Sequence, residues 1–183
     1  MIRLPLILAA ITSFGLGFSP GSQALAGDAA ESGFSQFLGV WTLKDDRFQQ
    51  VWDGDTVETL SIPNHLTHCT TANTFSSVSC AVDAGGFKGQ IFWVADPAHK
   101  TLHHLSHFGE SRTGVGTGQI DTEGNLINRI AFTDEPDGTY RIYEYDWVSD
   151  DEYTMMSRQF NADDEPTGNW YGGTFVRVTI EAD

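Results

Sequence analysis

The sequence LINRIAFTDEPDGTYRIYEYDW occupies residues 126–147 and carries the strongest indication of the fold. It consists of two runs rich in β-branched and aromatic residues, separated by the turn sequence EPDG at 135–138. Runs of this kind on either side of a turn that contains Pro and Gly are typical of a β-hairpin. We therefore predict two antiparallel strands, 126–133 and 139–147.

The pairing of these strands predicts which of their side chains face the interior. Since side chains alternate between the two faces of a strand, pairing Phe132 with Tyr140 gathers aliphatic residues on one face. The opposite face carries Arg129 and Arg141, so we expect the first face to be the inner one. A shift of one residue in the pairing would reverse this assignment. The predicted inner residues are Leu126, Asn128, Ile130, Phe132, Tyr140, Ile142, Glu144 and Asp146.

Similar β-rich runs, separated by turn sequences, extend along the chain from Phe37 onward. No segment after residue 26 shows the sustained 3.6-residue apolar period of a long helix. The pattern predicts a single all-β domain over 37–183, an antiparallel meander that forms a barrel or a sandwich. The runs are 39–44, 47–53, 56–62, 88–95, 101–108, 113–121, 126–133, 139–147, 152–160 and 170–180.

Residues 1–26 have the pattern of a signal peptide. Arg3 provides a positive charge, residues 4–18 are mostly apolar, and the sequence ALA at 24–26 fits a cleavage site. A membrane anchor is the alternative, but the apolar stretch is short and rich in glycine, whereas a spanning helix needs about 20 apolar residues. We expect export to the periplasm or the medium, and no membrane association after cleavage. Residues 27–36 are expected to form a flexible or short helical segment.

The charge of the chain limits its possible partners. The 183 residues include 25 acidic and 10 basic side chains, which gives a net charge of −15. Binding to nucleic acid or to anionic lipid requires clusters of Lys and Arg, so neither is an expected partner. Hydrophobic residues make up 40% of the chain, which is enough to support a folded core. The oligomeric state stays open.

Cys69 and Cys80 are the two cysteines of the chain. In an exported domain, two cysteines are most simply explained as one disulfide. A metal-binding pair or a reactive thiol is the alternative.

The two ends of the domain resemble a known family. Gly39-Val40-Trp41 places a Gly-x-Trp sequence at the start of the first strand, and Arg177 lies in the last one. This combination resembles the calycin or lipocalin-like proteins, in which the first-strand Trp closes the barrel floor and a late Arg packs across it. Motifs in the middle of the chain are similar to small exported bacterial proteins catalogued as a domain of unknown function. They are Asp96-Pro97 with the following Lys-x-Leu, Gly114-x-Gly116-x-Gly118, Pro136-Asp137-Gly138 and Tyr145-x-Trp147.

The resemblance implies a lipocalin-like barrel of about 8–10 strands with an internal cavity, and it implies no reaction. The leading hypothesis is an exported barrel that binds a small apolar or aromatic molecule in its lumen, because aromatic side chains are abundant. The candidate ligand-binding residues are Trp93, Asn128, Phe132, Tyr140, Ile142 and Glu144.

Two alternative functions remain. In the first, the barrel is a cofactor-free lyase, isomerase or hydrolase that uses Glu144 with His103 or His107 as acid and base. His103 and His107 share a strand face about 13 Å apart, too far to bind one ion without a bulge, so no metal site and no cofactor are predicted. In the second, the domain presents an acidic surface to a basic partner.

Overall fold

The computed structural model of the chain describes residues 35–72, 77–96 and 98–179. The predicted signal peptide, 1–26, lies outside the described residues, as does most of the predicted segment 27–36. Residues 35–37 form one short helical turn ahead of the first strand. Within the described ranges, no helix is long and apolar enough to cross a membrane.

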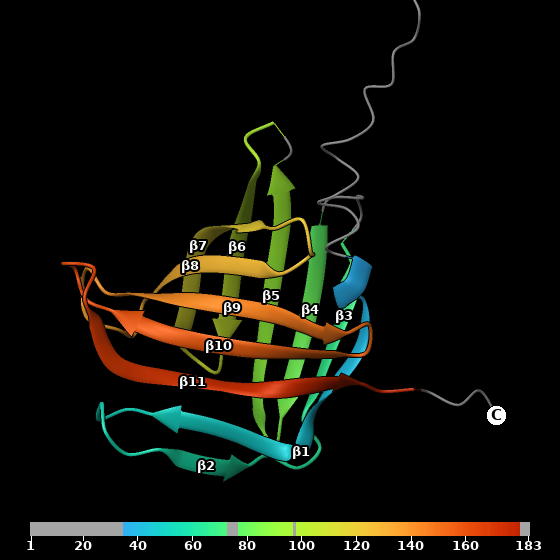
Figure 1. Cartoon of the computed structure of the whole chain (residues 1–183), viewed down its shortest axis with the longest axis horizontal. Coiled ribbons are helices and arrows are strands. Elements are labelled where there is room, and N and C mark those ends of the chain that lie inside the picture. The colour runs from blue at the N-terminus through green and yellow to red at the C-terminus, as the bar shows by residue number, and fades with distance from the viewer. Residues whose placement is uncertain (1–34, 73–76, 97, 180–183) are drawn as a thin grey trace, which may run out of the picture.

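The described chain is a meander of antiparallel strands (Figure 1). Consecutive strands pair from β3 to β11, β1 pairs with β3, and β11 pairs with β1, which closes a barrel of 10 strands. β2 pairs with the second half of β1 outside this ring. The predicted all-β fold and the closed barrel are confirmed. The strands are β1 (Gly39–Val51), β2 (Glu58–Ser61), β3 (Leu66–Thr71), β4 (Ser77–Ala84), β5 (Phe87–Asp96), β6 (Thr101–Phe108), β7 (Arg112–Ile120), β8 (Leu126–Phe132), β9 (Tyr140–Ser149), β10 (Glu152–Phe160) and β11 (Pro166–Arg177).

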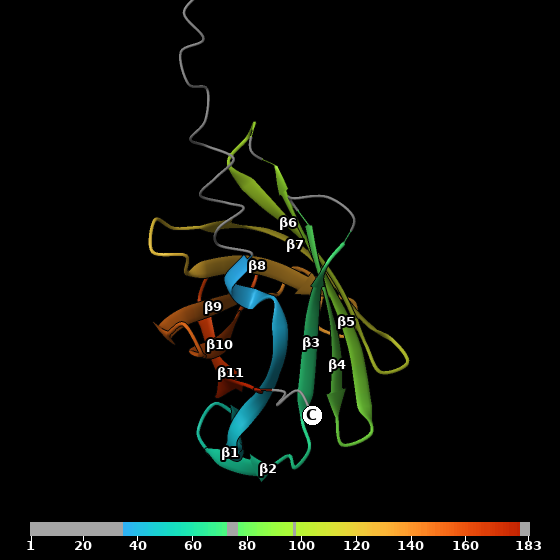
Figure 2. The ribbon, with the colours of Figure 1, turned by 90° about the vertical axis from the view of Figure 1, so that its right-hand side faces the viewer.

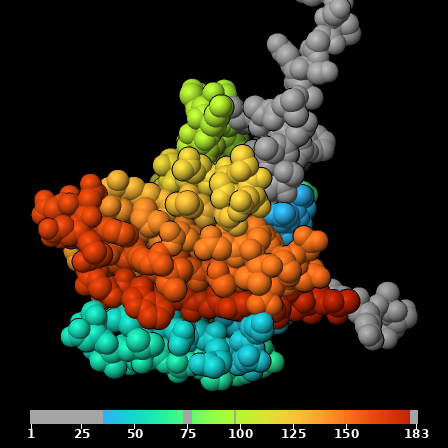
Figure 3. Space-filling model, viewed as in Figure 1, coloured from blue at the N-terminus to red at the C-terminus, as the bar shows by residue number. Residues whose placement is uncertain are grey.

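β1 reaches three neighbouring strands because its pairing is interrupted. Its first residues, Gly39–Trp41, pair with β3, and residues 47–50 pair with β2. β11 pairs with both parts on the other side, with a register shift between Leu43 and Phe48 that is typical of a β-bulge. The sequence predicted two strands here, and the structure joins them into one. The space-filling view shows β1 and β2 lying along β11 (Figure 3).

β3 and β4 form a hairpin that the disulfide fixes in register. Cys69 lies directly opposite Cys80, and their sulfurs are bonded, which confirms the predicted disulfide. Both side chains are buried in the barrel interior. Seen from the side, β3, β4 and β5 form one wall of the barrel, and β9, β10 and β11 form the other (Figure 2).

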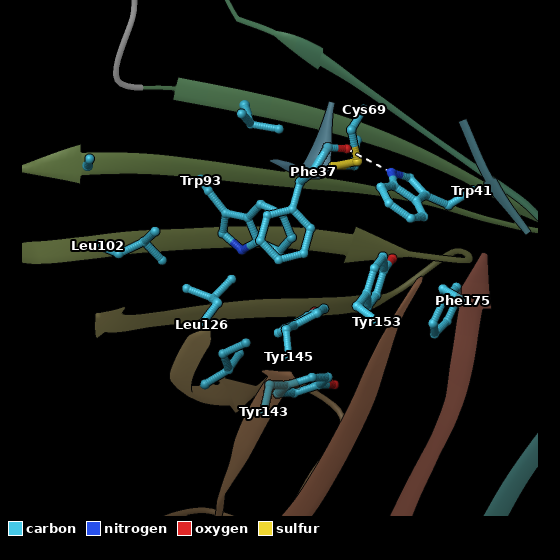
Figure 4. Close-up of a cluster of buried hydrophobic side chains, with 14 of the residues drawn as sticks. Phe37, Trp41, Cys69, Trp93, Leu102, Leu126, Tyr143, Tyr145, Tyr153 and Phe175 are labelled. Carbon is cyan, nitrogen blue, oxygen red and sulfur yellow. Dashed lines mark hydrogen bonds between the residues drawn. A yellow bond between two sulfur atoms is a disulfide. The ribbon is translucent and has the colours of Figure 1, made fainter. Parts of the chain in front are cut away.

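Aromatic side chains fill one end of the barrel interior (Figure 4). The ring of Phe37, from the helical turn, has its centroid 5.2 Å from Trp93 and 4.9 Å from Trp147. Trp41 has no exposed surface, and its Nε1 donates a hydrogen bond of 2.8 Å to the carbonyl of Phe37. The helical turn therefore enters the barrel and closes this end, which we call the aromatic end.

Arg177 holds the aromatic end together from outside. Its guanidinium carbon lies 4.2 Å from the centre of the Trp41 ring, as the resemblance to lipocalin-like proteins implied. Its Nη1 donates to the carbonyl of Leu38 at 2.6 Å, its Nη2 donates to the carbonyl of Gln36 at 3.0 Å, and its Nε donates to the Asp151 carboxylate at 2.8 Å. One side chain thus connects the helical turn, β1 and the loop between β9 and β10.

The pairing of β8 with β9 differs from the predicted one by one residue. Ile130 lies opposite Arg141, so the predicted pairing of Phe132 with Tyr140 is wrong. The prediction kept Arg141 out of the interior because burial of an unpaired charge is costly. In the structure, Glu135 of the connecting turn pairs with that side chain inside the barrel.

Because of this shift, the predicted inner face is correct for β8 and wrong for β9. The buried residues of β8 are those that were predicted to face the interior: Leu126, Asn128, Ile130 and Phe132. The residues of β9 that lie on the outer face are Tyr140, Ile142, Glu144 and Asp146, and those on the inner face are Arg141, Tyr143, Tyr145 and Trp147.

A buried histidine contacts the aromatic end. Trp93 Nε1 donates to His104 Nδ1 at 2.9 Å, and His104 Nε2 lies 2.9 Å from Ser106 Oγ. Because an indole N–H can only donate, Nδ1 is unprotonated and the neutral ring carries its proton on Nε2. Burial lowers the pKa of His104 to about 4. The ring therefore stays neutral in the folded protein until the solution is distinctly acidic.

We predict that His104 makes the protein less stable in mild acid. Below its ordinary pKa of 6.5 the unfolded chain binds a proton at this histidine, whereas the folded chain does so only near pH 4. The free energy of unfolding therefore falls as the pH drops through this range, by about 3 kcal/mol in total. Urea unfolding at several pH values, for the wild type and for His104→Gln, measures this contribution.

The matched control is His103→Gln, which changes an exposed histidine of the same strand. The control should lose as much stability in acid as the wild type does. In His104→Gln this loss should be smaller by about 3 kcal/mol. Equal pH dependence in the two variants would contradict the assignment.

Candidate functional site

A network of polar side chains lies in the part of the interior away from Phe37, which we call the polar end. Glu135, in the turn between β8 and β9, has a side chain that is only 6% exposed. It accepts hydrogen bonds from Arg141 Nε at 2.6 Å, from Arg112 Nη2 at 2.9 Å and from Gln159 Nε2 at 3.1 Å. Burial opposes the ionisation of Glu135, but these donors outweigh it and hold the pKa of the carboxyl below its ordinary value.

Arg141 is the central side chain of the polar end. It has no exposed surface, and its Nη1 and Nη2 have no hydrogen-bond partner among the described residues. The guanidinium carbon lies 4.9 Å from the ring centre of Trp52 and 4.7 Å from that of Tyr171. Aromatic faces attract a guanidinium, but they leave its in-plane N–H groups without acceptors. Two donors of a buried cation are therefore left for a further acceptor.

Two more buried side chains with polar atoms that lack partners among the described residues, Asn128 and Ser157, lie near Arg141 on the inner wall of the barrel. Tyr143 is the neighbour of Arg141 along the inner face of β9, and it pairs with Asn128 on one side and Ser157 on the other. The amide oxygen and nitrogen of Asn128 and the hydroxyl of Ser157 are buried without partners in the described chain. Buried polar groups are normally paired, so this group of unpaired atoms requires an explanation.

The close packing of β7 fixes the position of Asn128. Gly118 lies opposite Asn128, and a Cβ built on Gly118 would be 2.2 Å from the Asn128 amide oxygen. Gly114 likewise faces Phe132, whose ring would be 2.5 Å from an added Cβ. The Gly-x-Gly-x-Gly sequence therefore makes room for inner side chains of β8.

The polar end pairs two arginines with two carboxylates. Arg112 and Arg141 share the buried carboxylate of Glu135. Arg112, whose side chain is 18% exposed, also forms a bidentate pair with Asp134 at 2.7 and 2.8 Å. The ion pair between Arg141 and Glu135 uses Nε of the guanidinium alone.

The predicted ligand-binding residues are divided between the inside and the outside of the barrel. Trp93, Asn128 and Phe132 lie inside, as expected. Trp93 belongs to the aromatic end, while Phe132 lies under the guanidinium of Arg112 at 3.8 Å. The shift on β9 places Tyr140, Ile142 and Glu144 on the outer face. Their predicted position in the lumen is therefore wrong.

The predicted acid and base residues do not converge. Glu144 forms an ion pair with Arg158 on the outer face, and His107 contacts Thr113 at 3.0 Å. His103 lies three strands away from Glu144, a separation of about 14 Å. No three His, Cys, Asp or Glu side chains of the described residues are arranged to hold a metal ion.

His103 lines a shallow hollow of about 450 Å³ on the outer face of the barrel. Arg129 lies on one side of this hollow with its guanidinium 3.6 Å from the ring centre of Tyr140. The hydroxyl of Tyr140 donates to Asp164 at 2.8 Å, so this tyrosine ties two neighbouring turns together. These contacts give Tyr140 a structural role outside the lumen.

Most of the polar end was not predicted from the sequence. Arg141 was expected on the outer face, and no pattern singled out Arg112, Ser157 or Trp52. A signal was present, because the hairpin 126–147 contains an acid in its turn and a basic residue just after it. Such a pair can be buried together, whereas each residue alone would be expected at the surface.

The fold and the interior define a class of protein: a closed, antiparallel β-barrel of 10 strands with one aromatic and one polar end. No family model matches the chain, and no curated protein matches it. One similar solved structure is a protein of unknown function of the DUF3598 family from Nostoc punctiforme. It is 12% identical, the match covers 81% of this chain and 99% of that one, and the TM-score is 0.22. The fold is therefore assigned from the topology of the chain itself.

We predict that Glu135 is essential for the polar end to stay folded. Glu135→Gln would leave the fully buried guanidinium of Arg141 without its ion-pair partner and Arg112 with Asp134 alone, which should lower the free energy of unfolding by about 3–5 kcal/mol. Chemical denaturation measures this loss. The control is Asp134→Asn, which removes an exposed partner of Arg112 and should cost less than about 1 kcal/mol. Similar losses in both variants would contradict a buried role for Glu135.

Proposed function

We propose that the protein binds a small organic molecule in the polar end of the barrel. The observation that carries this proposal is the group of buried polar atoms on Arg141, Asn128 and Ser157 that have no partner among the described residues. A buried donor or acceptor without a partner costs about 1–3 kcal/mol, so a group of them is difficult to explain by stability alone. A ligand that hydrogen-bonds to them removes this cost.

The apolar surfaces around these atoms suit the predicted apolar or aromatic body of the ligand. Phe132, Trp52 and Tyr171 present ring faces near the two arginines. The aromatic end is a poor candidate, because the rings around Phe37 already pack against one another. These contacts favour the polar end over the aromatic end as the ligand site.

Trp52 controls access in this proposal. It follows the last residue of β1 and its side chain contacts Arg141 and Tyr171, yet the residue is 49% exposed. Since Arg141 has no exposed surface, a ligand reaches it by displacing the indole of Trp52. A half-exposed ring in a turn can move at lower cost than a buried one.

Binding is favoured over the enzymatic alternative by the positions of the candidate acid and base. Glu144 is paired with Arg158 and is distant from His103. Export remains part of the proposal, and the bond between Cys69 and Cys80 supports it, since disulfides persist in oxidising compartments.

Native mass spectrometry of the protein, purified without denaturation from the cells that naturally make it, tests this function. The wild type should carry a bound organic molecule that is lost on denaturation, and its mass should correspond to a chain without residues 1–26. Trp52→Ala should release the molecule at least about tenfold faster, because the site is no longer covered.

The control Leu60→Ala removes a side chain of β2 that is also exposed, and it should retain the molecule as the wild type does. The proposal is overturned if the wild type is found as a bare chain and takes up no molecule from an extract of its own culture.

A further inference from the structure

We infer that the ligand is a monocarboxylate, bound through its carboxylate to Nη1 and Nη2 of Arg141. This inference rests on the proposed function and specifies the chemistry of the same site. It follows from the geometry of the guanidinium, from the charge of the network and from the neighbouring polar groups.

The guanidinium of Arg141 has one occupied and one unoccupied edge. Glu135 accepts from Nε through a single oxygen, Oε1, which is shared with Arg112. The remaining edge carries Nη1 and Nη2, both buried and both unpaired within the described chain. Two parallel N–H groups at this spacing match the two oxygens of a carboxylate, which forms a bidentate, charge-assisted pair. A neutral amide offers one acceptor oxygen without a negative charge, so its pair with the guanidinium is weaker than that of a carboxylate.

The charge of the network favours a ligand with one negative charge. Arg112 is already paired with Asp134 as well as with Glu135, so among the described residues of this network the buried cationic donors left for a ligand are those of Arg141. One carboxylate engages these donors, whereas a second negative charge would be buried without a cationic partner at high cost. Phosphate monoesters and dicarboxylates are therefore disfavoured.

The buried polar side chains near Arg141 indicate a second polar group on the ligand. Asn128 and Ser157 lie on the strands that flank β9, and both are opposite Tyr143, which is two residues from Arg141. Such diagonal neighbours have Cα atoms about 7–8 Å apart across paired strands. Asn128 offers both a donor and an acceptor, and Ser157 offers a hydroxyl. A hydroxyl or carbonyl near the carboxylate of the ligand would pair with them.

The ring faces that border the guanidinium define the rest of the ligand. Trp52 and Tyr171 both contact Arg141 through their faces. A planar body attached to the carboxylate can take the place of the indole when Trp52 moves aside. The favoured class is thus a small hydroxylated monocarboxylic acid with an aromatic or other planar apolar body.

Isothermal titration calorimetry with three matched probes tests this inference. Salicylate is a monoanion with an adjacent hydroxyl, salicylamide is its neutral analogue, and phthalate is a dianion of similar size. The wild type should bind salicylate at least about tenfold more tightly than either of the other two. Equal affinity for salicylate and salicylamide would overturn the inference, and so would the absence of binding by all three.

Arg141→Lys keeps the positive charge next to Glu135 but removes the two parallel donors, so it should abolish most of the preference for salicylate. Ser157→Ala is a second variant that leaves the charges intact, and it should weaken salicylate binding by a few-fold. Arg129→Gln, on the outer face, is the control and should bind as the wild type does. Preserved preference in Arg141→Lys, with a folded protein by circular dichroism, would overturn the inference.

Failure of the inference is distinguishable from failure of the proposed function. A protein that carries a neutral molecule in native mass spectrometry and shows no preference for salicylate binds a ligand, but not a carboxylate. A bare chain in native mass spectrometry contradicts the function itself.

Discussion

The pairing of β1 with β11 is the constraint on which the rest of the structure depends, because it converts a meander into a closed barrel with an interior. Arg177 reinforces this closure by lying across Trp41 and by donating to the carbonyls of the segment that carries Phe37. The same interactions place the Phe37 ring inside the aromatic end. Closure thus fills one end of the barrel with aromatic rings, while the other end holds the buried network of Glu135 and Arg141.

The two ends of the interior satisfy opposite physical requirements. At the aromatic end, rings pack on rings and the polar tip of Trp41 finds a carbonyl partner, so burial stabilises the fold. At the polar end, Glu135 compensates for part of the charge of Arg112 and Arg141 and leaves donors unpaired. A protein that only needed stability would gain from apolar residues at these positions, since buried ion pairs are often no better than hydrophobic packing. Recognition of a ligand explains why they are retained.

The alternation of residues along β8 was sufficient to predict its inner face, and the two cysteines predicted their bond. The same alternation gave the wrong face of β9, because the two strands were paired one residue out of register and the face without arginine was taken as the inner one. Glu135 is close in sequence, but the sequence alone does not reveal that the turn folds back over the lumen. Ser157 and Trp52 could not have been found, since their relation to Arg141 depends on strand pairings and on a bulge in β1.

Ligand binding at the polar end can be tested with a high-resolution crystal structure of the protein, purified without denaturation from the cells that naturally make it. We expect density for a small organic acid with its carboxylate within about 3 Å of both Nη atoms of Arg141, and with Trp52 displaced from the guanidinium. A structure in which Trp52 still covers Arg141, and in which ordered water or protein carbonyls bind both Nη atoms, would contradict ligand binding at this site.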